Sequence, residues 1–180
     1  MQVLARCESD LQRPDQVTPR SDSSTSDSEQ ISVERLIAAP SEQIFDLIAD
    51  PTRHHDFDGS GAVHTLKTGP QRLALGSTFV MSMRMFIRYS TVSTVVEFEE
   101  NRRIAWQTYS TIKWLAKWGG GRIWSYELQP EQEGTLVRET WNFATEAPHA
   151  KKNLAKERTG NYMINAMERS LVLLEETVSR

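Results

Sequence analysis

The sequence predicts an α+β domain in which a curved antiparallel sheet wraps around a long C-terminal helix, with two short helices after the first strand. Two observations carry this prediction. A series of strand-like segments is joined by short connections, which favours antiparallel pairing. Residues 152–180 then show apolar side chains at spacings of three and four, which share one helix face: Ile164, Met167, Leu171, Leu174 and Val178.

The ordered domain is predicted to span residues 31–180. Residues 1–30 are predicted to be a disordered tail, because the stretch at 21–30 is serine-rich and acidic and contains no apolar residue. A first strand follows at 31–36, where Ile31 and Val33 alternate with polar residues.

Two short helices are expected after this strand. Pro40 is tolerated at a helix start, and Ser41 can cap free amides there. The helix should end before Pro51, because the residue preceding a proline disfavours helical geometry. A second short helix is predicted at 51–55. The buried face of the first helix would consist of Ile44, Phe45 and Ile48.

The strands of the sheet follow in sequence after a turn at 59–61. Their β-branched and aromatic residues alternate with polar ones, and turn residues separate them. Tight turns are expected at 99–102 and 131–134, and a long loop at 110–121. The predicted strands are residues 62–68, 78–85, 89–98, 103–109, 122–128 and 135–144.

Composition excludes several functional classes. The net charge is −3 and its signs are mixed, whereas nucleic-acid binding needs a clustered basic face. The single cysteine, Cys7, gives neither an intramolecular disulfide nor a cysteine zinc site, and favours a reducing cytoplasm. No stretch is long and apolar enough for a transmembrane segment or a secretory signal. A local basic run is interpreted as a solvated helix face: Lys151, Lys152, Lys156 and Arg158.

Motifs of several common enzyme classes are missing. The sequence contains no Ser-His-Asp order, phosphate loop, dinucleotide glycine motif or His-Glu-x-x-His zinc motif. Adjacent His54 and His55 point apart, so with Asp56 and Asp58 they are a weak signal for a metal site. We therefore predict no metal and no cofactor, and a rim role for His55 in ligand access or acid–base work.

Several phrases of the sequence resemble the START-like, or SRPBCC, superfamily, in its polyketide cyclase/dehydrase and lipid-transport branch. The resemblance covers residues 31–180 and implies the helix-grip fold. Its motifs are specific for fold and weak for activity, because members include cyclases, binding proteins and proteins without assigned chemistry. The phrases are IAAPSEQIFDLIADP at 37–51, DGSG at 58–61, TVVEFEENRRIAW at 94–106, TWN at 140–142 and NAM at 165–167.

Alternation along the strands predicts an aromatic and aliphatic interior facing the last helix. Val92, Thr94, Val96 and Phe98 are assigned to one inward face, and Val137, Glu139, Trp141 and Phe143 to another. This composition is typical of a small-molecule pocket, although the same side chains can simply fill a core. The predicted ligand-binding residues are Phe79, Met81, Met83, Val96, Phe98, Trp106, Trp114, Trp118, Trp124, Tyr126, Trp141, Met163, Met167 and Leu171.

Glu139 is the sharpest candidate for chemistry. Its strand position lies on an apolar face, where a carboxylate would be desolvated and its pKa raised, as a general acid or base near neutral pH requires. His55 and Tyr126 are the other candidate catalytic residues. The structural alternatives are a strand end where Glu139 reaches solvent, or a buried salt bridge. The possible partners in that bridge are Arg84, Arg122 and Arg138, the last on the opposite face.

The loop at 110–121 is unusually apolar for a connection. It carries Trp114 and Trp118 beside Lys113 and Lys117, and ends in three glycines that allow wide backbone freedom. The loop can be a lid over the cavity, an interface for a homodimer or protein partner, a contact with an anionic lipid surface, or ordinary packing at the sheet edge.

Three functions remain open. The favoured one is binding of a hydrophobic small molecule, such as a lipid, polyketide or aromatic metabolite, between the sheet and the C-terminal helix. The second is a polyketide cyclase/dehydratase-type enzyme in which Glu139 moves protons with His55 or Tyr126. The third is a protein-interaction member, toxin- or regulator-like, that uses the tryptophan loop.

Overall fold

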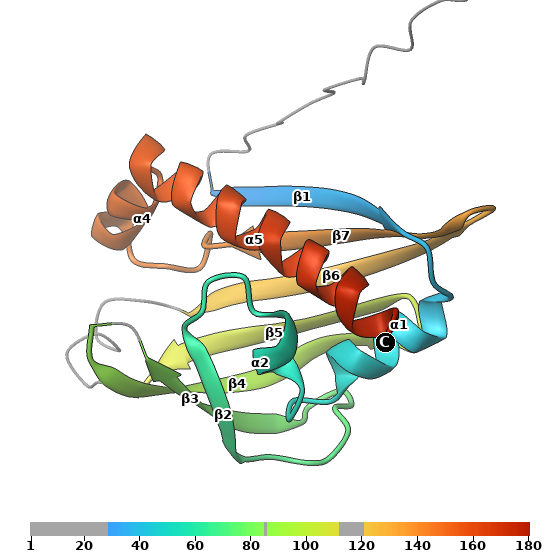
Figure 1. The fold of residues 1–180 in the computed structure, drawn as a ribbon. Helices are drawn as coiled ribbons and strands as arrows, with labels where there is room; N and C mark the ends of the chain where they lie inside the picture. Colours follow the sequence, from blue (N-terminus) through green and yellow to red (C-terminus); the bar gives the residue numbers. More distant parts are fainter. Residues whose placement is uncertain (1–28, 85, 112–120) are drawn as a thin grey trace, which may run out of the picture.

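The computed structural model describes residues 29–84, 86–111 and 121–180 (Figure 1). The disordered tail predicted for 1–30 lies outside these residues except for Glu29 and Gln30, and Gln30 already belongs to the first strand. The elements in chain order are β1 (Gln30–Ile37), α1 (Ser41–Ala49), α2 (His54–Phe57), β2 (Val63–Thr68), β3 (Thr78–Arg84), β4 (Arg88–Glu99), β5 (Arg103–Ser110), β6 (Arg122–Glu131), β7 (Gly134–Asn142), α4 (Pro148–Leu154) and α5 (Glu157–Val178).

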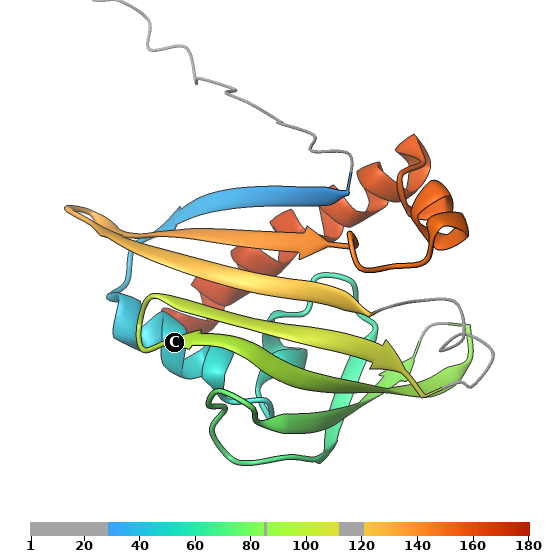
Figure 2. The same ribbon diagram turned by 180° about the vertical axis from the view of Figure 1, so that it is seen from behind.

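Within the described ranges, seven strands form one antiparallel sheet in the order β1-β7-β6-β5-β4-β3-β2. The strands follow one another along the chain except that β1 closes the far edge beside β7. Figures 1 and 2 show a curved sheet with α5 lying diagonally across one face and α1 and α2 on the same side. The predicted α+β fold, a curved antiparallel sheet wrapped around a long C-terminal helix, is confirmed.

The first two helices form as expected with two differences: Ser41 makes no capping hydrogen bond, because Pro40 holds the N-cap position, and the second helix is shifted. Pro40 precedes α1 in extended geometry, and the helix ends at Ala49, just before Asp50 and Pro51. Ile44, Phe45 and Ile48 are fully buried, as the sequence predicts. The second helix begins at His54 and not at Pro51, so the expected range of 51–55 was wrong.

The terminal helix is shorter than predicted. The sequence predicts one helix over 152–180, but the chain forms α4 and α5 with a break at Ala155 and Lys156, where Lys156 is extended. The apolar face of α5 is nevertheless the expected one, because Met167, Leu171 and Leu174 are buried while Ile164 and Val178 are partly buried.

A bulge in β4 changes which side chains face the interior. Val95 pairs with Trp106 while Glu97 pairs with the next residue, Ala105, so Val96 is an extra residue that interrupts the alternation. Before the bulge, Thr91, Ser93 and Val95 face inward; after it, Phe98 does. Two of the residues assigned inward therefore lie on the other side: Val92 and Thr94 precede the bulge and face outward, while Val96, within the bulge, is 39% exposed.

The turn between α2 and β2 fixes these elements against α5. Both Asp58 carboxylate oxygens accept hydrogen bonds within the turn, including one from the Val63 amide at 2.7 Å. The Gly59 amide donates to Ser170 Oγ at 2.9 Å. A Cβ atom on Gly59 would lie 2.0 Å from the Ala166 carbonyl oxygen, so only glycine allows the turn to approach the helix this closely.

Candidate functional site

The interior between the sheet and α5 contains most of the predicted binding residues, packed in two adjoining clusters. One lies under α1 and α2 and includes Phe79, Met81, Trp106, Tyr126 and Leu171. The other lies under the first half of α5 and contains Trp141 and Met167, with Trp124 and Met163 against them. Met83 and Phe98 pack on the first cluster and are partly buried.

A stack of aromatic rings crosses the first cluster. The ring centroids of His54 and Trp106 are 5.2 Å apart, and those of Trp106 and Tyr126 are 5.7 Å apart. The planes of the two rings are inclined by 23° in the first pair and by 29° in the second. His54 Nε2 is 2.9 Å from the Ile48 carbonyl oxygen. Because a carbonyl oxygen only accepts, Nε2 carries the proton. Burial lowers the pKa of His54 to about 4, so the imidazole is neutral near pH 7.

His54 is therefore the interior histidine of this segment, whereas the sequence singled out its neighbour His55 for a role at the cavity rim. The His55 side chain is 48% exposed and pairs with Asp56 at 3.1 Å on the surface. The helical spacing of His54 and Phe57, which are both buried, is the signal that identifies the correct residue. The rim role predicted for His55 is compatible with this exposed position and stays a prediction.

Glu139 lies on the inner face of β7 and is 2% exposed. Tyr126 is its direct partner across β6 and β7, and the Tyr126 hydroxyl donates to Glu139 Oε1 at 2.9 Å. Burial raises the pKa of Glu139 to about 8, and the pKa of Tyr126 is also raised, by burial and then by the nearby carboxyl. Glu139 is consequently uncharged for the most part at pH 7.

The expected arginine partners do not reach Glu139. Arg122 pairs with Glu146 at 2.9 Å, and Arg138 pairs with Glu34 and Glu127 on the opposite face of the sheet. Glu139 is therefore neutralised by its own proton and not by an arginine, as is usual for a buried carboxyl without a cation nearby. The raised pKa predicted from the sequence agrees with the structure; the salt-bridge alternative does not.

Two buried polar atoms on β7 lack a hydrogen-bond partner in the part of the chain that the structure describes. They are Glu139 Oε2 and the indole Nε1 of Trp141. The two residues are two positions apart on one strand, so their side chains leave the same face about 7 Å apart along it. A carboxyl group can donate or accept and an indole N–H only donates, so one small polar group between them can satisfy both.

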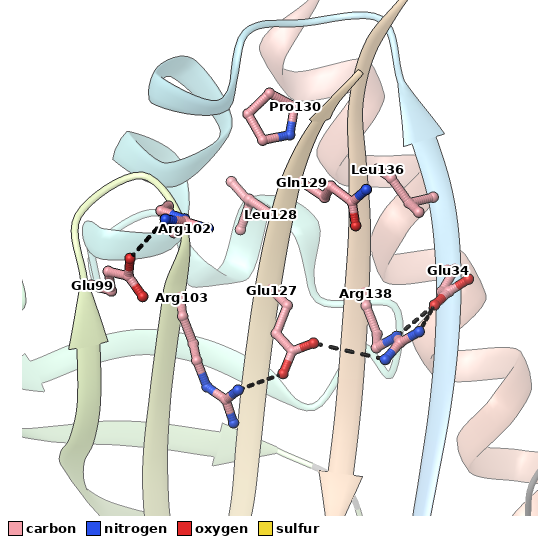
Figure 3. A pocket seen from close by; sticks show the side chains of 10 residues that line it. All are labelled: Glu34, Glu99, Arg102, Arg103, Glu127, Leu128, Gln129, Pro130, Leu136 and Arg138. Atoms are coloured by element: carbon pink, nitrogen blue, oxygen red, sulfur yellow. Dashed lines mark hydrogen bonds and ion pairs between the residues drawn. The ribbon is translucent and has the colours of Figure 1, made fainter.

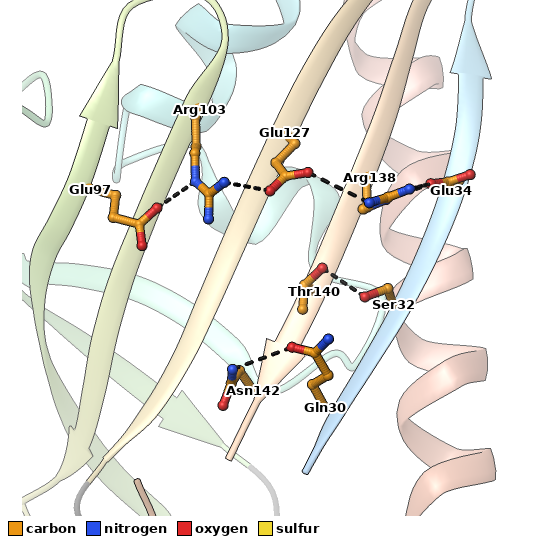
Figure 4. A network of polar contacts seen from close by, with 9 residues as sticks. All are labelled: Gln30, Ser32, Glu34, Glu97, Arg103, Glu127, Arg138, Thr140 and Asn142. Atoms are coloured by element: carbon orange, nitrogen blue, oxygen red, sulfur yellow. Dashed lines mark hydrogen bonds and ion pairs between the residues drawn. The ribbon is translucent and has the colours of Figure 1, made fainter. Parts of the chain in front are cut away.

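The outer face of the sheet is a separate, charged surface. Ion pairs of alternating sign cross five strands, from Glu97 through Arg103, Glu127 and Arg138 to Glu34 (Figure 4). A hollow of about 340 Å³ opens on this face near the β6–β7 hairpin, and these same pairs line part of it (Figure 3). Its paired charges do not suit a hydrophobic ligand, so we place the candidate site on the inner face.

The sequence matches the family of polyketide cyclase/dehydrase and lipid transport proteins over residues 28–179. The chain belongs to this family. An uncharacterized protein of Mycobacterium tuberculosis, Rv0088, is 33% identical over 150 residues, which cover 80% of this chain and 62% of the relative. The chain thus spans less than two thirds of that relative's length.

Solved structures share the fold of this family member. Protein CV1439 from Chromobacterium violaceum superposes with a TM-score of 0.64 at 16% identity, over 84% of this chain and 98% of the other. Protein Ms6760 from Mycobacterium smegmatis superposes with a TM-score of 0.65 at 13% identity, over 85% of this chain and 92% of the other. At such identities the likeness establishes the fold alone.

Three further features concern the tryptophan loop, metal ligands and membrane-spanning helices. Trp114 and Trp118 lie outside the described residues, so the tryptophan loop stays a prediction. Over the described ranges, no cluster of three or more His, Cys, Asp or Glu side chains has the arrangement of a metal site. None of the helices that the structure describes is long and apolar enough to cross a membrane.

Proposed function

We propose that the protein binds a hydrophobic small molecule between the sheet and α5, and that Glu139 and Trp141 hold the polar group of that molecule. A lipid, a polyketide or an aromatic metabolite would fit this description. The observation that carries the proposal is the pair of buried, unpartnered polar atoms on β7, Glu139 Oε2 and Trp141 Nε1. Apolar and aromatic side chains surround this pair.

The energetic argument concerns groups left without a partner. A buried polar group without a hydrogen bond costs about 1–3 kcal/mol, so two such groups on one strand call for a bound oxygen or hydroxyl. Glu139 is neutral at pH 7 because its pKa is about 8. The proposed partner is accordingly an uncharged group, such as a carbonyl or hydroxyl oxygen, at one end of an apolar molecule.

The side chains around this pair can make room for a ligand. Met81, Met83, Met163 and Met167 all contribute to the interior clusters. Methionine side chains are unbranched and adjust their shape readily, so they can repack around an inserted molecule. Met83 and Met163 are also only partly buried, which places adaptable side chains next to solvent.

The test is native mass spectrometry of gently purified protein, with organic extraction of any ligand and addition of the extract back to stripped protein. We expect a defined added mass, and a rise in melting temperature when the ligand returns. Glu139→Leu and Trp141→Phe should each weaken binding about 5- to 30-fold, which corresponds to one lost hydrogen bond of about 1–2 kcal/mol.

Arg138→Gln is the matched control on the same strand, because Arg138 points to the outer face and forms its pairs there. It should bind the ligand like the unmodified protein. The proposal would be refuted if no member of a broad library of lipids, polyketides and aromatic compounds stabilised the stripped protein.

The contact between Tyr126 and Glu139 also favours a second candidate function, proton-transfer catalysis on a bound polyketide. A carboxyl with a pKa of about 8, hydrogen-bonded to a buried phenol, can exchange protons near neutral pH. In that case Glu139→Gln should reduce turnover about 100-fold or more while the variant still binds substrate. Unchanged turnover would remove Glu139 from the mechanism.

A further inference from the structure

The connection between β3 and β4 exposes large apolar side chains. Phe86 is fully exposed and Ile87 is 59% exposed. Single exposed apolar residues are ordinary on protein surfaces, but these two are adjacent and lie at the tip of a projecting hairpin (Figure 1). Phe86 is surrounded by water and Ile87 is more than half exposed, so a partner that buries them would gain the transfer free energy of the area it covers.

Two arginines flank this tip on either side. Arg84 and Arg88 are register partners across β3 and β4, and both are exposed. Neither forms an ion pair with any residue that the structure describes. Like charges directly opposite each other destabilise a strand pair. The hairpin therefore presents two like charges opposite each other at its tip.

More unpaired cations lie at the same end of the molecule. Lys152 is in α4, and Lys156 and Arg158 are at the start of α5; all three are exposed. They too form no ion pair within the described ranges, whereas the neighbouring Lys151 pairs with Glu29. Figures 1 and 2 both place α4 and the β3–β4 hairpin at one end. A chain of net charge −3 thus presents five cations there that pair with no acidic residue among those the structure describes.

We propose that this end docks on an anionic lipid surface, with Phe86 and Ile87 entering the interface and the five cations facing the headgroups. A lipid surface offers both kinds of contact at once, because hydrocarbon lies just below a layer of negative charge. A nucleic acid would satisfy the cations but has no apolar layer for the isoleucine. The docking end is distinct from the ligand-holding pair on β7, so the two proposals stand or fall separately.

The experiment is flotation of the full chain with lipid vesicles in about 0.1 M salt, where surface charges are only partly screened. One vesicle is phosphatidylcholine alone and the other is phosphatidylcholine with phosphatidylglycerol. We expect the protein to float with the anionic vesicle only. The double variants Phe86→Ser with Ile87→Ser, and Arg84→Glu with Arg88→Glu, should each weaken partitioning by about tenfold or more.

Matched controls remove the same chemistry elsewhere. Leu75 is 66% exposed in the loop before β3, at the other end of that strand, and Arg180 is an exposed cation at the C-terminus. Leu75→Ser and Arg180→Glu should float like the unmodified protein. Circular dichroism should show that every variant is folded, as expected for changes at exposed positions.

Three results would overturn docking on lipid. They are flotation that does not depend on phosphatidylglycerol, equal losses in the variants and their controls, and binding to duplex DNA that is as tight as binding to vesicles and indifferent to Phe86 and Ile87. Glu139→Leu protein should float normally. Loss of ligand binding with normal flotation would therefore separate the interior site from the docking end.

Discussion

Glu139 and His54 show how burial acts on single groups. Both side chains lie in the interior, and the same desolvation raises the pKa of the carboxyl to about 8 and lowers that of the imidazole to about 4. Near pH 7 both groups are neutral. The interior thus contains an acid and a base without containing a charge, which suits an uncharged apolar ligand.

The pH dependence of stability should report these two groups with opposite signs. Folded Glu139 keeps its proton up to about pH 8, whereas the unfolded chain loses it near pH 4.5, so stability falls as pH rises between these values. Unfolded His54 gains a proton below pH 6.5 while the folded form resists until about pH 4, so stability also falls as pH decreases through that window.

Between pH 6.5 and 8, only Glu139 of this pair contributes a slope. There the free energy of unfolding should fall by up to about 1.4 kcal/mol per pH unit. Urea denaturation of Glu139→Gln should show that this contribution is gone. The control Glu176→Gln, at an exposed position on α5, should retain it. Equal slopes in both variants would mean that Glu139 is charged in the folded protein.

At the scale of elements, the turn at Asp58 and Gly59 determines how closely α2 and β2 approach α5. This explains the DGSG phrase physically: the carboxylate organises the turn, and the missing side chain of Gly59 allows the Ser170 contact. The sequence predicts a turn there. It does not indicate that the turn touches a helix more than 100 residues later, because that contact depends on tertiary packing.

Gly59→Ala should therefore destabilise the protein by about 1–3 kcal/mol or more, since a methyl group would overlap the Ala166 carbonyl. Chemical denaturation measures the change. Gly160→Ala, inside α5, is the matched control. A Cβ atom there would lie 3.7 Å from Ile31 Cδ1 on β1, which is an ordinary van der Waals distance. That change should be neutral or stabilising by up to about 1 kcal/mol. Equal effects would contradict the close approach.

Departures from prediction within the elements have identifiable causes. The bulge at Val96 leaves no mark in a sequence of β-branched residues, so simple alternation assigned Val92 and Thr94 to the wrong face. The break between α4 and α5 falls among residues that favour helix, and the chain there turns to carry α5 across the sheet. In both places the global path of the chain overrides the local pattern.

At the scale of the whole molecule, the fold was predictable because strand alternation and helix periodicity agree along most of the chain. The inner faces of β6 and β7 and the raised pKa of Glu139 followed from the same alternation. Tyr126 was one of the two partners that the sequence offered for Glu139, but the choice between them, and the burial of His54 beside Trp106, depend on cross-strand register and helix phase. The distribution of free cations likewise depends on which surface groups find a partner.

The bulge in β4 also divides the inward-facing residues of this strand into two groups of different chemistry. On the hairpin side of Val96, the inward residues of β4 include Thr91 and Ser93, and the Ser93 hydroxyl lies 2.8 Å from that of Thr108. Beyond the bulge, Phe98 packs edge-on against Phe45. A single inserted residue thus changes the lining that β4 itself contributes, from hydroxyl groups on the hairpin side to an aromatic ring on the side of α1.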